Sequence, residues 1–194
     1  MPKNVEKMST NYSPNFGLKK RSTKNIKYLI YHYTGMKNDK TAIKRLTNFN
    51  SKVSCHYYID RKGSLTCIVP DLYIAWHAGK SKWKNDKLLN KTSIGIEISN
   101  PGHENGYESF KKKQLKCLIK ITKLLIKKYS IKKQNILGHS DIAPLRKKDP
   151  GEKFPWKFFA NNKIGLWHKI NLRKCKILRG KHLNIESRIF FEKL

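Results

Sequence analysis

One segment of this sequence restricts the fold more than any other, because its two sides differ sharply in polarity. From about Phe110 to Tyr129, apolar residues recur at intervals of three and four, while lysines fill the opposite side. This pattern predicts a long amphipathic helix whose apolar face is covered by other elements. The side chains expected on that face are Leu115, Leu118, Ile119, Thr122, Leu125, Ile126 and Tyr129.

Runs of β-branched and aromatic residues predict the strands. Residues 25–33 (NIKYLIYHY) and 93–99 (SIGIEIS) are typical of interior strands. The segments HYYID and SLTCIV flank residues 60–63, which predicts a hairpin with Gly63 at positive φ. A shorter helix is expected from the Asn38 cap to about Phe49. This mixture predicts an α/β fold with a mixed central β-sheet flanked by helices.

The length of 194 residues favours a single domain. Residues 1–25 are polar and are expected to form an irregular N-terminal arm. Residues 26–160 are expected to form the folded domain. Residues 161–194 are expected to be a basic tail that packs on the domain or extends it, because they are too few for a second domain.

The charge is strongly unbalanced, with 43 Lys and Arg against 13 Asp and Glu, a formal net charge of +30. An excess of this size raises affinity for polyanions such as nucleic acid, anionic lipid or acidic glycan–peptide polymers. The alternative is a general lysine bias, which the scatter of lysines through the chain favours. No recognised nucleic-acid motif or concentrated basic arm is present, so specific nucleic-acid binding is the weaker hypothesis.

The cysteines and the first residues exclude other classes. Cys55, Cys67, Cys117 and Cys175 form no CxxC pair, so neither a zinc finger nor a dense disulfide framework is indicated. The first sixteen residues contain no apolar run typical of a signal peptide, and no window approaches a membrane span. We therefore expect a cytoplasmic protein, with periplasmic or extracellular export by another route left open.

Three residues have the chemistry of a metal site. His32 ends the first apolar strand, His139 follows the apolar segment NILG, and Asp149 lies ten residues further on. Two imidazoles and one carboxylate are a ligand set that leaves zinc an open position for water. Taken singly, a histidine at the end of a strand is more often a polar surface residue or a hydrogen-bonded residue than a metal ligand.

Glu97 stands out because it interrupts an apolar strand. Ile94, Ile96 and Ile98 point to one face, so Glu97 points to the other together with Gly95. A carboxylate in such a strand is costly unless it is paired with a cation or has a function. The two explanations are a buried pair with a lysine and a catalytic carboxylate.

Six segments occur in an order that resembles one known family. They are IYHYTG, SCHYYID, WHAG, TSIGIEISN, LGHSDIAPLRKKDPG and FPW. The sequence is similar to the zinc N-acetylmuramoyl-L-alanine amidases, which include amidase-type phage lysozymes and animal peptidoglycan-recognition proteins. The likeness extends from about Tyr12 to about Phe159. The segment NYSPNFG resembles the bacterial members that process muropeptides, including anhydro-muropeptides.

The resemblance implies an enzyme that hydrolyses the amide between N-acetylmuramic acid and L-alanine, with residues 26–160 as its catalytic domain. It implies one zinc ion per chain, held by His32, His139 and Asp149. Glu97 matches the general base and acid of the reaction, and Lys147 matches the cation that stabilises the tetrahedral intermediate. Lys147 belongs to a run of three cations, and its offset from Asp149 favours it over its neighbours.

The remaining candidates concern the substrate, expected to be peptidoglycan fragments or muropeptides. His56 is interpreted as structural or groove-lining, and Trp76 with His77 as part of the groove wall. Asn90 and Asn100 flank the Glu97 strand and are candidates for hydrogen bonds to peptide or glycan. Trp76, Trp83 and Trp156 either stack on sugar or belong to the core. A peptidoglycan-binding protein without catalysis is the minor alternative, because all three ligands and Glu97 are present.

Overall fold

A six-stranded mixed sheet forms the centre of the computed structural model, which describes residues 8–168. Its order is β1-β5-β4-β9-β3-β10, and every neighbouring pair is parallel except the β4–β5 hairpin. The mixed sheet with flanking helices is the predicted fold class, which is confirmed. The strands are β1 (Ser9–Thr10), β5 (Leu65–Cys67), β4 (Tyr57–Ile59), β9 (Ser93–Ile98), β3 (Tyr28–Tyr33) and β10 (Ile136–Gly138).

Smaller elements complete the fold. Two ribbons pair β2 (Phe16–Gly17) with β6 (Ile74–Ala75) and β7 (Lys82–Trp83) with β8 (Asp86–Lys87). The helices are α1 (Asp39–Thr47), α2 (Lys112–Tyr129), α3 (His139–Ile142) and α4 (Trp156–Asn161). Short 3-10 turns are η1 (Thr23–Asn25), η2 (Phe49–Ser51), η3 (Leu89–Lys91), η4 (His103–Asn105) and η5 (Lys133–Asn135).

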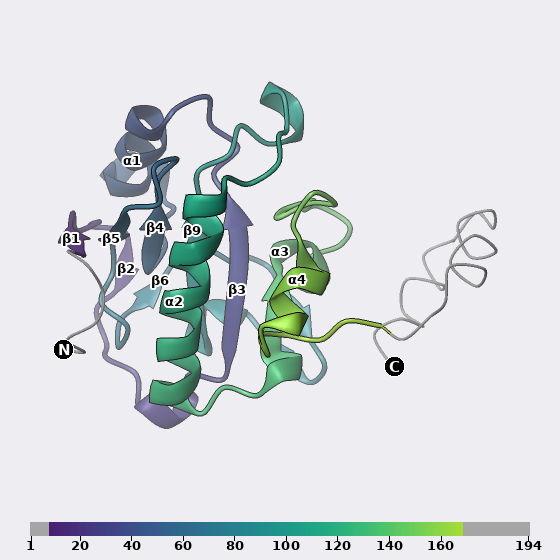
Figure 1. Cartoon of the computed structure of the whole chain (residues 1–194). Coiled ribbons are helices and arrows are strands. Elements are labelled where there is room, and N and C mark those ends of the chain that lie inside the picture. Colours follow the sequence, from purple (N-terminus) through teal and green to yellow (C-terminus); the bar gives the residue numbers. More distant parts are fainter. Residues whose placement is uncertain (1–7, 169–194) are drawn as a thin grey trace.

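The long helix α2 covers one face of the sheet (Figure 1). Leu118 is fully buried and packs in one core with strand residues that include Ile94 and Ile96. Phe159 of α4 joins the same core. The predicted helix is confirmed, but its buried face is rotated from the predicted one. Ile121 is buried, whereas Leu115, Ile119 and Ile126 are only partly buried.

The other face of the sheet carries two separate apolar clusters. One lies under α1 and includes Leu46 and Tyr58. The other includes Ile30 of β3 and Ile142 of α3. Side chains paired in register on neighbouring strands share a face. The row His32–Glu97–Tyr58 therefore brings polar groups onto the face that carries the two clusters.

Local signals in the sequence correspond to defined features. Gly63 has φ 85° in the turn between β4 and β5. The Asn38 side chain accepts a hydrogen bond from Thr41 N–H at the start of α1. This helix ends at Thr47, and Phe49, which follows it, is 59% exposed.

The predicted irregular arm differs from the structure over residues 8–25. β1 joins the sheet through β5, and β2 pairs with β6. Arg21 is buried, and its guanidinium donates to the carbonyl oxygens of Asp71, Asn90 and Ser93. These bonds tie the segment to the sheet, a tertiary effect that its polar composition did not indicate. Of the expected basic tail, residues 169–194 lie outside the described residues.

Within residues 8–168, no helix is both long and apolar enough to cross a bilayer.

The core between α2 and the sheet leads to a stability prediction. Leu118→Ala is expected to lower the free energy of unfolding by about 2–5 kcal/mol, because Leu118 is fully buried and its truncation leaves a cavity. Urea denaturation measures the change. Lys116→Ala on the exposed side of the same helix is the control, with an expected change within about 0.5 kcal/mol. Equal effects of the two substitutions would contradict this core assignment.

Candidate metal centre

Three side chains converge at one edge of the sheet. His32 lies near the end of β3, and His139 follows the parallel neighbour β10 directly. The Nδ1 atoms of the two imidazoles are 2.9 Å apart, and Asp149 Oδ2 lies 3.0 Å from each. All three residues are buried. The structure thus brings together the three residues for which the sequence predicted a metal site.

The outer nitrogen of each imidazole is already engaged. His139 Nε2 lies 3.1 Å from the carbonyl oxygen of Ala78, which only accepts hydrogen bonds. The proton of a neutral His139 is therefore on Nε2, and its Nδ1 presents a lone pair to Asp149. His32 Nε2 lies 3.0 Å from His77 Nδ1. A carboxylate and imidazole lone pairs at this spacing repel one another unless a positive charge lies between them.

The pKa values of His32 and Asp149 favour the protonation states in which these side chains bind a metal ion. Burial, followed by the nearby His139, lowers the pKa of His32 to about 4, so this imidazole is neutral at neutral pH. Burial alone would raise the pKa of Asp149, but a proton shared with His139 or His32, in the place that a metal ion would take, holds the pKa below its ordinary value. Two imidazoles and one carboxylate form a three-ligand set that fits zinc with a fourth position open.

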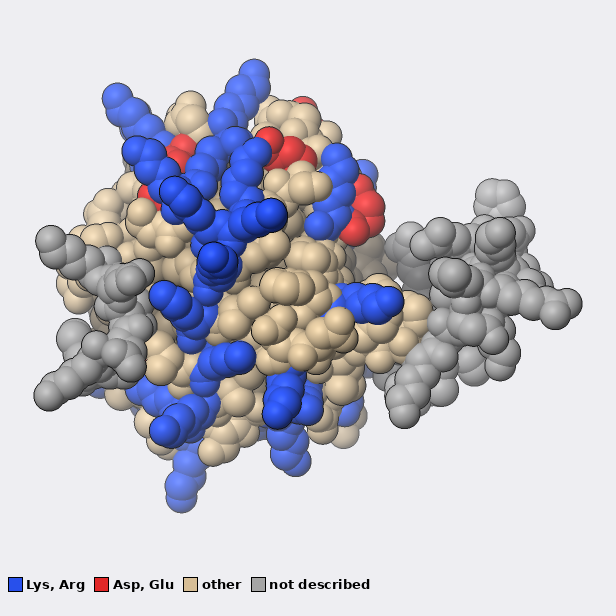
Figure 2. All heavy atoms as spheres, in the orientation of Figure 1, with Lys and Arg blue, Asp and Glu red and all other residues tan. Residues whose placement is uncertain are grey.

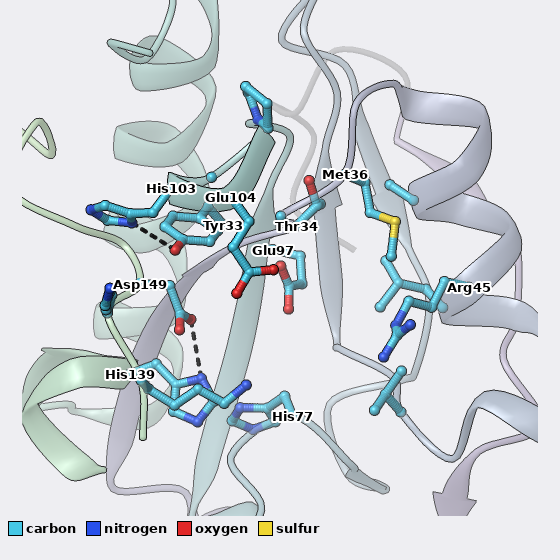
Figure 3. Close-up of a pocket in the computed structure, with 18 of the residues that line it drawn as sticks. Tyr33, Thr34, Met36, Arg45, His77, Glu97, His103, Glu104, His139 and Asp149 are labelled. Atoms are coloured by element: carbon cyan, nitrogen blue, oxygen red, sulfur yellow. Dashed lines mark hydrogen bonds and ion pairs between the residues drawn. The ribbon is translucent and has the colours of Figure 1, made fainter. Parts of the chain in front are cut away.

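Glu97 lies beside this centre on β9, in register with His32 on β3. Its side chain faces the pocket, as does that of Asp149 (Figure 3). Burial raises the pKa of Glu97 well above its ordinary value, and the charge of Asp149 adds to the shift. Within residues 8–168, its Oε2 is sealed from solvent and has no hydrogen-bond partner. A carboxyl group with this pKa and a free oxygen is suited to accept and return a proton.

A pocket of about 440 Å³ opens over the centre. Of the residues predicted to line a groove, Trp76 and His77 do so, and Lys147 also lines the pocket. Sequence reasoning missed several other lining residues, because no local pattern tells which side of a helix or loop faces the site. These are Arg45 and Met36 at α1 and the loop before it, and His103 and Glu104 of η4.

Contacts and burial distinguish the three consecutive cations Arg146, Lys147 and Lys148. Arg146 donates to the carbonyl oxygens of Ala78 and Lys80, so its guanidinium is held by the backbone. Lys147 is half-buried, whereas Lys148 is exposed. The positive charge of Lys147 lowers the pKa of Glu97, against the effect of burial. Lys147 is thus the cation of the run that acts electrostatically on Glu97.

Three predicted groove residues are not among those that line this pocket, and their contact with substrate stays a prediction. His56 is buried, and its Nδ1 accepts a hydrogen bond from Gly95 N–H at 3.0 Å, which agrees with the structural alternative. Asn100 is also buried and bonds to the backbone of Gly102 and Glu108. Asn90 accepts from two backbone N–H groups. In each case the side chain is engaged by the backbone through at least one polar atom.

The tryptophans divide between pocket and core. Trp76 lines the pocket. Trp83 packs against the apolar cluster that contains Ile30. Trp156 is stacked on Tyr31 with ring centroids 5.8 Å apart, in the core under α2. The core alternative therefore holds for Trp83 and Trp156.

Comparison with known proteins assigns the chain to a family. The family model described as N-acetylmuramoyl-L-alanine amidase matches residues 22–152. The chain belongs to the N-acetylmuramoyl-L-alanine amidase family. The matched range includes every residue of the metal centre as well as Glu97 and Lys147.

Two curated members of the amidase family illustrate the degree of similarity. The chain is 39% identical over 154 residues to the N-acetylmuramoyl-L-alanine amidase AmiD of Escherichia coli (strain K12), covering 73% of this chain and 55% of AmiD. It is 35% identical over 115 residues to the 1,6-anhydro-N-acetylmuramyl-L-alanine amidase AmpD of Haemophilus influenzae, covering 59% of this chain and 60% of AmpD. The chain thus spans somewhat more than half the length of these relatives.

Solved amidase structures share the fold. A complex of Escherichia coli AmiD with anhydro-N-acetylmuramic acid-L-Ala-D-γ-Glu-L-Lys superposes with a TM-score of 0.69 at 35% identity, covering 82% of this chain and 65% of that one. The structure of AmpDh3 from Pseudomonas aeruginosa gives a TM-score of 0.71 at 30% identity, covering 87% of this chain and 68% of that one.

The buried His56 leads to a prediction of pH dependence. Burial, followed by the charge of Arg21, lowers its pKa from 6.5 to about 3. Between these values the unfolded chain binds a proton at His56 that the folded protein does not. The free energy of unfolding of metal-free protein should therefore fall as the pH falls, with His56 contributing on the order of 1 kcal/mol per pH unit.

Urea denaturation of metal-free protein at several pH values between about 6 and 4 measures this slope. The His56→Gln variant lacks the titrating group, so its slope should be shallower whatever its absolute stability. Equal slopes for the two proteins would contradict the assignment of a neutral, buried His56.

Proposed function

We propose that this protein is a zinc-dependent amidase that cleaves the bond between N-acetylmuramic acid and L-alanine in muropeptides. The observation that carries the proposal is the convergence of His32, His139 and Asp149 beside the unpaired carboxyl oxygen of Glu97. Zinc held by the three ligands would polarise the amide carbonyl and lower the pKa of water towards about 7.

Glu97 and Lys147 supply the other chemical functions. Glu97 takes the proton from the attacking water and returns it to the departing amine of L-alanine, and its raised pKa makes it a stronger base for the first of these transfers. Lys147 lines the same pocket and provides the positive charge that stabilises the developing oxyanion. Residues 26–160 form the catalytic domain in this proposal, with residues 8–25 as part of its framework.

The substrate class is supported by the pocket and by the relatives. Arg45, Lys147 and Lys148 line the pocket, so it favours the free carboxylates of a peptide stem. Solved AmiD and AmpDh3 complexes contain anhydro-N-acetylmuramic acid–tripeptide and anhydromuramic pentapeptide, respectively. We infer that small anhydro-muropeptides are among the substrates here. The cytoplasmic location expected from the sequence remains a prediction.

The strong positive charge of the chain does not favour nucleic-acid binding over the proposed amidase function. Figure 2 shows Lys and Arg side chains distributed across the face that α2 presents, with few acids among them. This distribution fits non-specific, salt-sensitive attraction to polyanions better than a dedicated nucleic-acid site. A binding protein without catalysis is the second alternative, and its discriminating property would be retention of fragments without turnover.

The proposed reaction is tested with defined MurNAc–tripeptide and its anhydro form, followed by mass spectrometry. Zinc-loaded protein is expected to release the free peptide that begins with L-alanine. Chelated protein and Glu97→Gln should release none, because the first lacks the metal and the second cannot accept a proton. Binding of both substrates without release by the zinc-loaded protein would contradict catalysis and indicate the binding alternative.

A second comparison tests the role of Lys147. Lys147→Ala should lower kcat by about 10²–10³-fold, because the developing oxyanion loses the cation that stabilises it. Lys148→Ala is a matched control from the same loop and the same pocket, and its kcat should change little. Equal losses in the two variants would show that only general positive charge matters and would contradict a specific role for Lys147.

A further inference from the structure

The geometry points to a supporting turn, residues 76–79, that positions both histidines of the metal centre. In this turn His77 is a positioning residue, which fixes the orientation of His32 and the nitrogen that carries its proton. The inference rests on the proposed zinc centre and extends it to residues that are not ligands. It also gives His77 a role different from the substrate wall expected from the sequence.

A chain of hydrogen bonds sets the protonation of His32. Ser93 Oγ lies 2.5 Å from the carbonyl oxygen of Leu89, so the hydroxyl donates its proton there. Ser93 Oγ is then an acceptor for His77 Nε2–H, 3.1 Å away. His77 Nδ1 consequently has no proton and accepts from His32 Nε2–H at 3.0 Å. The remaining nitrogen of His32, Nδ1, faces the metal centre as a lone pair.

The same turn holds the second histidine. The carbonyl oxygen of Ala78, the residue after His77, accepts the hydrogen bond from His139 Nε2–H. Asn90 Oδ1 in turn accepts from the backbone N–H groups of His77 and Ala78, at 3.1 and 2.7 Å. One asparagine therefore fixes the turn whose side chain orients His32 and whose backbone orients His139.

The position of the His77 ring depends on Gly95. A Cβ atom at residue 95 would overlap the ring, with His77 Cδ2 only 2.7 Å away. The His77 side chain is buried in this space, and its ring is edge-on to that of His32 with centroids 5.1 Å apart. The absence of a side chain in the middle of β9 thus makes room for the ring that supports His32.

Partners that orient a metal-ligating histidine through its second nitrogen contribute to metal affinity, and their loss typically costs about 10–100-fold. The test is zinc affinity by competition with a chelator, together with the visible spectrum of cobalt-substituted protein, which reports ligand geometry without requiring turnover. The melting temperature of each metal-free protein shows whether it is folded.

His77→Leu and His77→Asn are nearly equal in size, but only Asn places an acceptor oxygen close to the position of Nδ1. His77→Leu should weaken zinc binding by about 10–100-fold and alter the cobalt spectrum. His77→Asn should recover most of the affinity. Wild-type affinity and an unchanged spectrum in His77→Leu would overturn the inference.

A second pair of variants keeps the test decisive if substitutions at His77 do not fold. Ser93→Ala removes the acceptor for His77 and should weaken zinc binding. Ser99→Ala removes a buried hydroxyl directly after the same strand without touching a histidine and should leave zinc binding unchanged. Equal affinities of these two variants would overturn the inference, whereas a wild-type protein that binds no zinc would overturn the proposed metal centre itself.

Discussion

The repulsion among three acceptor atoms is the constraint on which the site depends. His32 Nδ1, His139 Nδ1 and Asp149 Oδ2 lie within 3.0 Å of one another in the interior, and the other nitrogen of each imidazole is bonded elsewhere. One proton satisfies two of these atoms well, whereas a metal ion satisfies all three. A metal ion at this position would also offset the repulsion between the charges of Asp149 and Glu97. Burial and the charge of Asp149 both raise the pKa of Glu97, which has no hydrogen-bonded cation of its own.

The central sheet separates its largest apolar core from the polar residues of the metal centre. One face carries the core under α2 and is almost wholly apolar. The opposite face concentrates its apolar contacts in two separate clusters and leaves polar residues in register across β3, β9 and β4. Parallel β3 and β10 end at the same edge, which brings His32 and His139 together. The largest apolar core and the candidate metal centre therefore lie on different faces of the same strands.

Much of this arrangement is visible in the sequence, because it follows local patterns. The strands around His32 and Glu97 and the helix α2 were predictable from side-chain period and type. The alternation in β9 placed Glu97 opposite its isoleucines, and family motifs brought His32, His139 and Asp149 into one hypothesis. The position of His32 and His139 at strand ends did not by itself distinguish a metal ligand from an ordinary polar residue.

What the sequence did not predict depends on contacts between distant segments. Arg21 is polar and looked like part of an arm, yet it binds three carbonyl groups far along the chain. Asn90 looked like a substrate contact but supports a turn. Arg45 lies on the exposed side of α1, and no local pattern revealed that this side borders the pocket.

The most direct test of the central claim is X-ray absorption of zinc-loaded protein, compared with His139→Ala. The account predicts one zinc per chain with nitrogen and oxygen ligands at about 2.0–2.2 Å, and loss of one imidazole from the spectrum of the variant. Sulfur ligation, or a spectrum unchanged by His139→Ala, would contradict it.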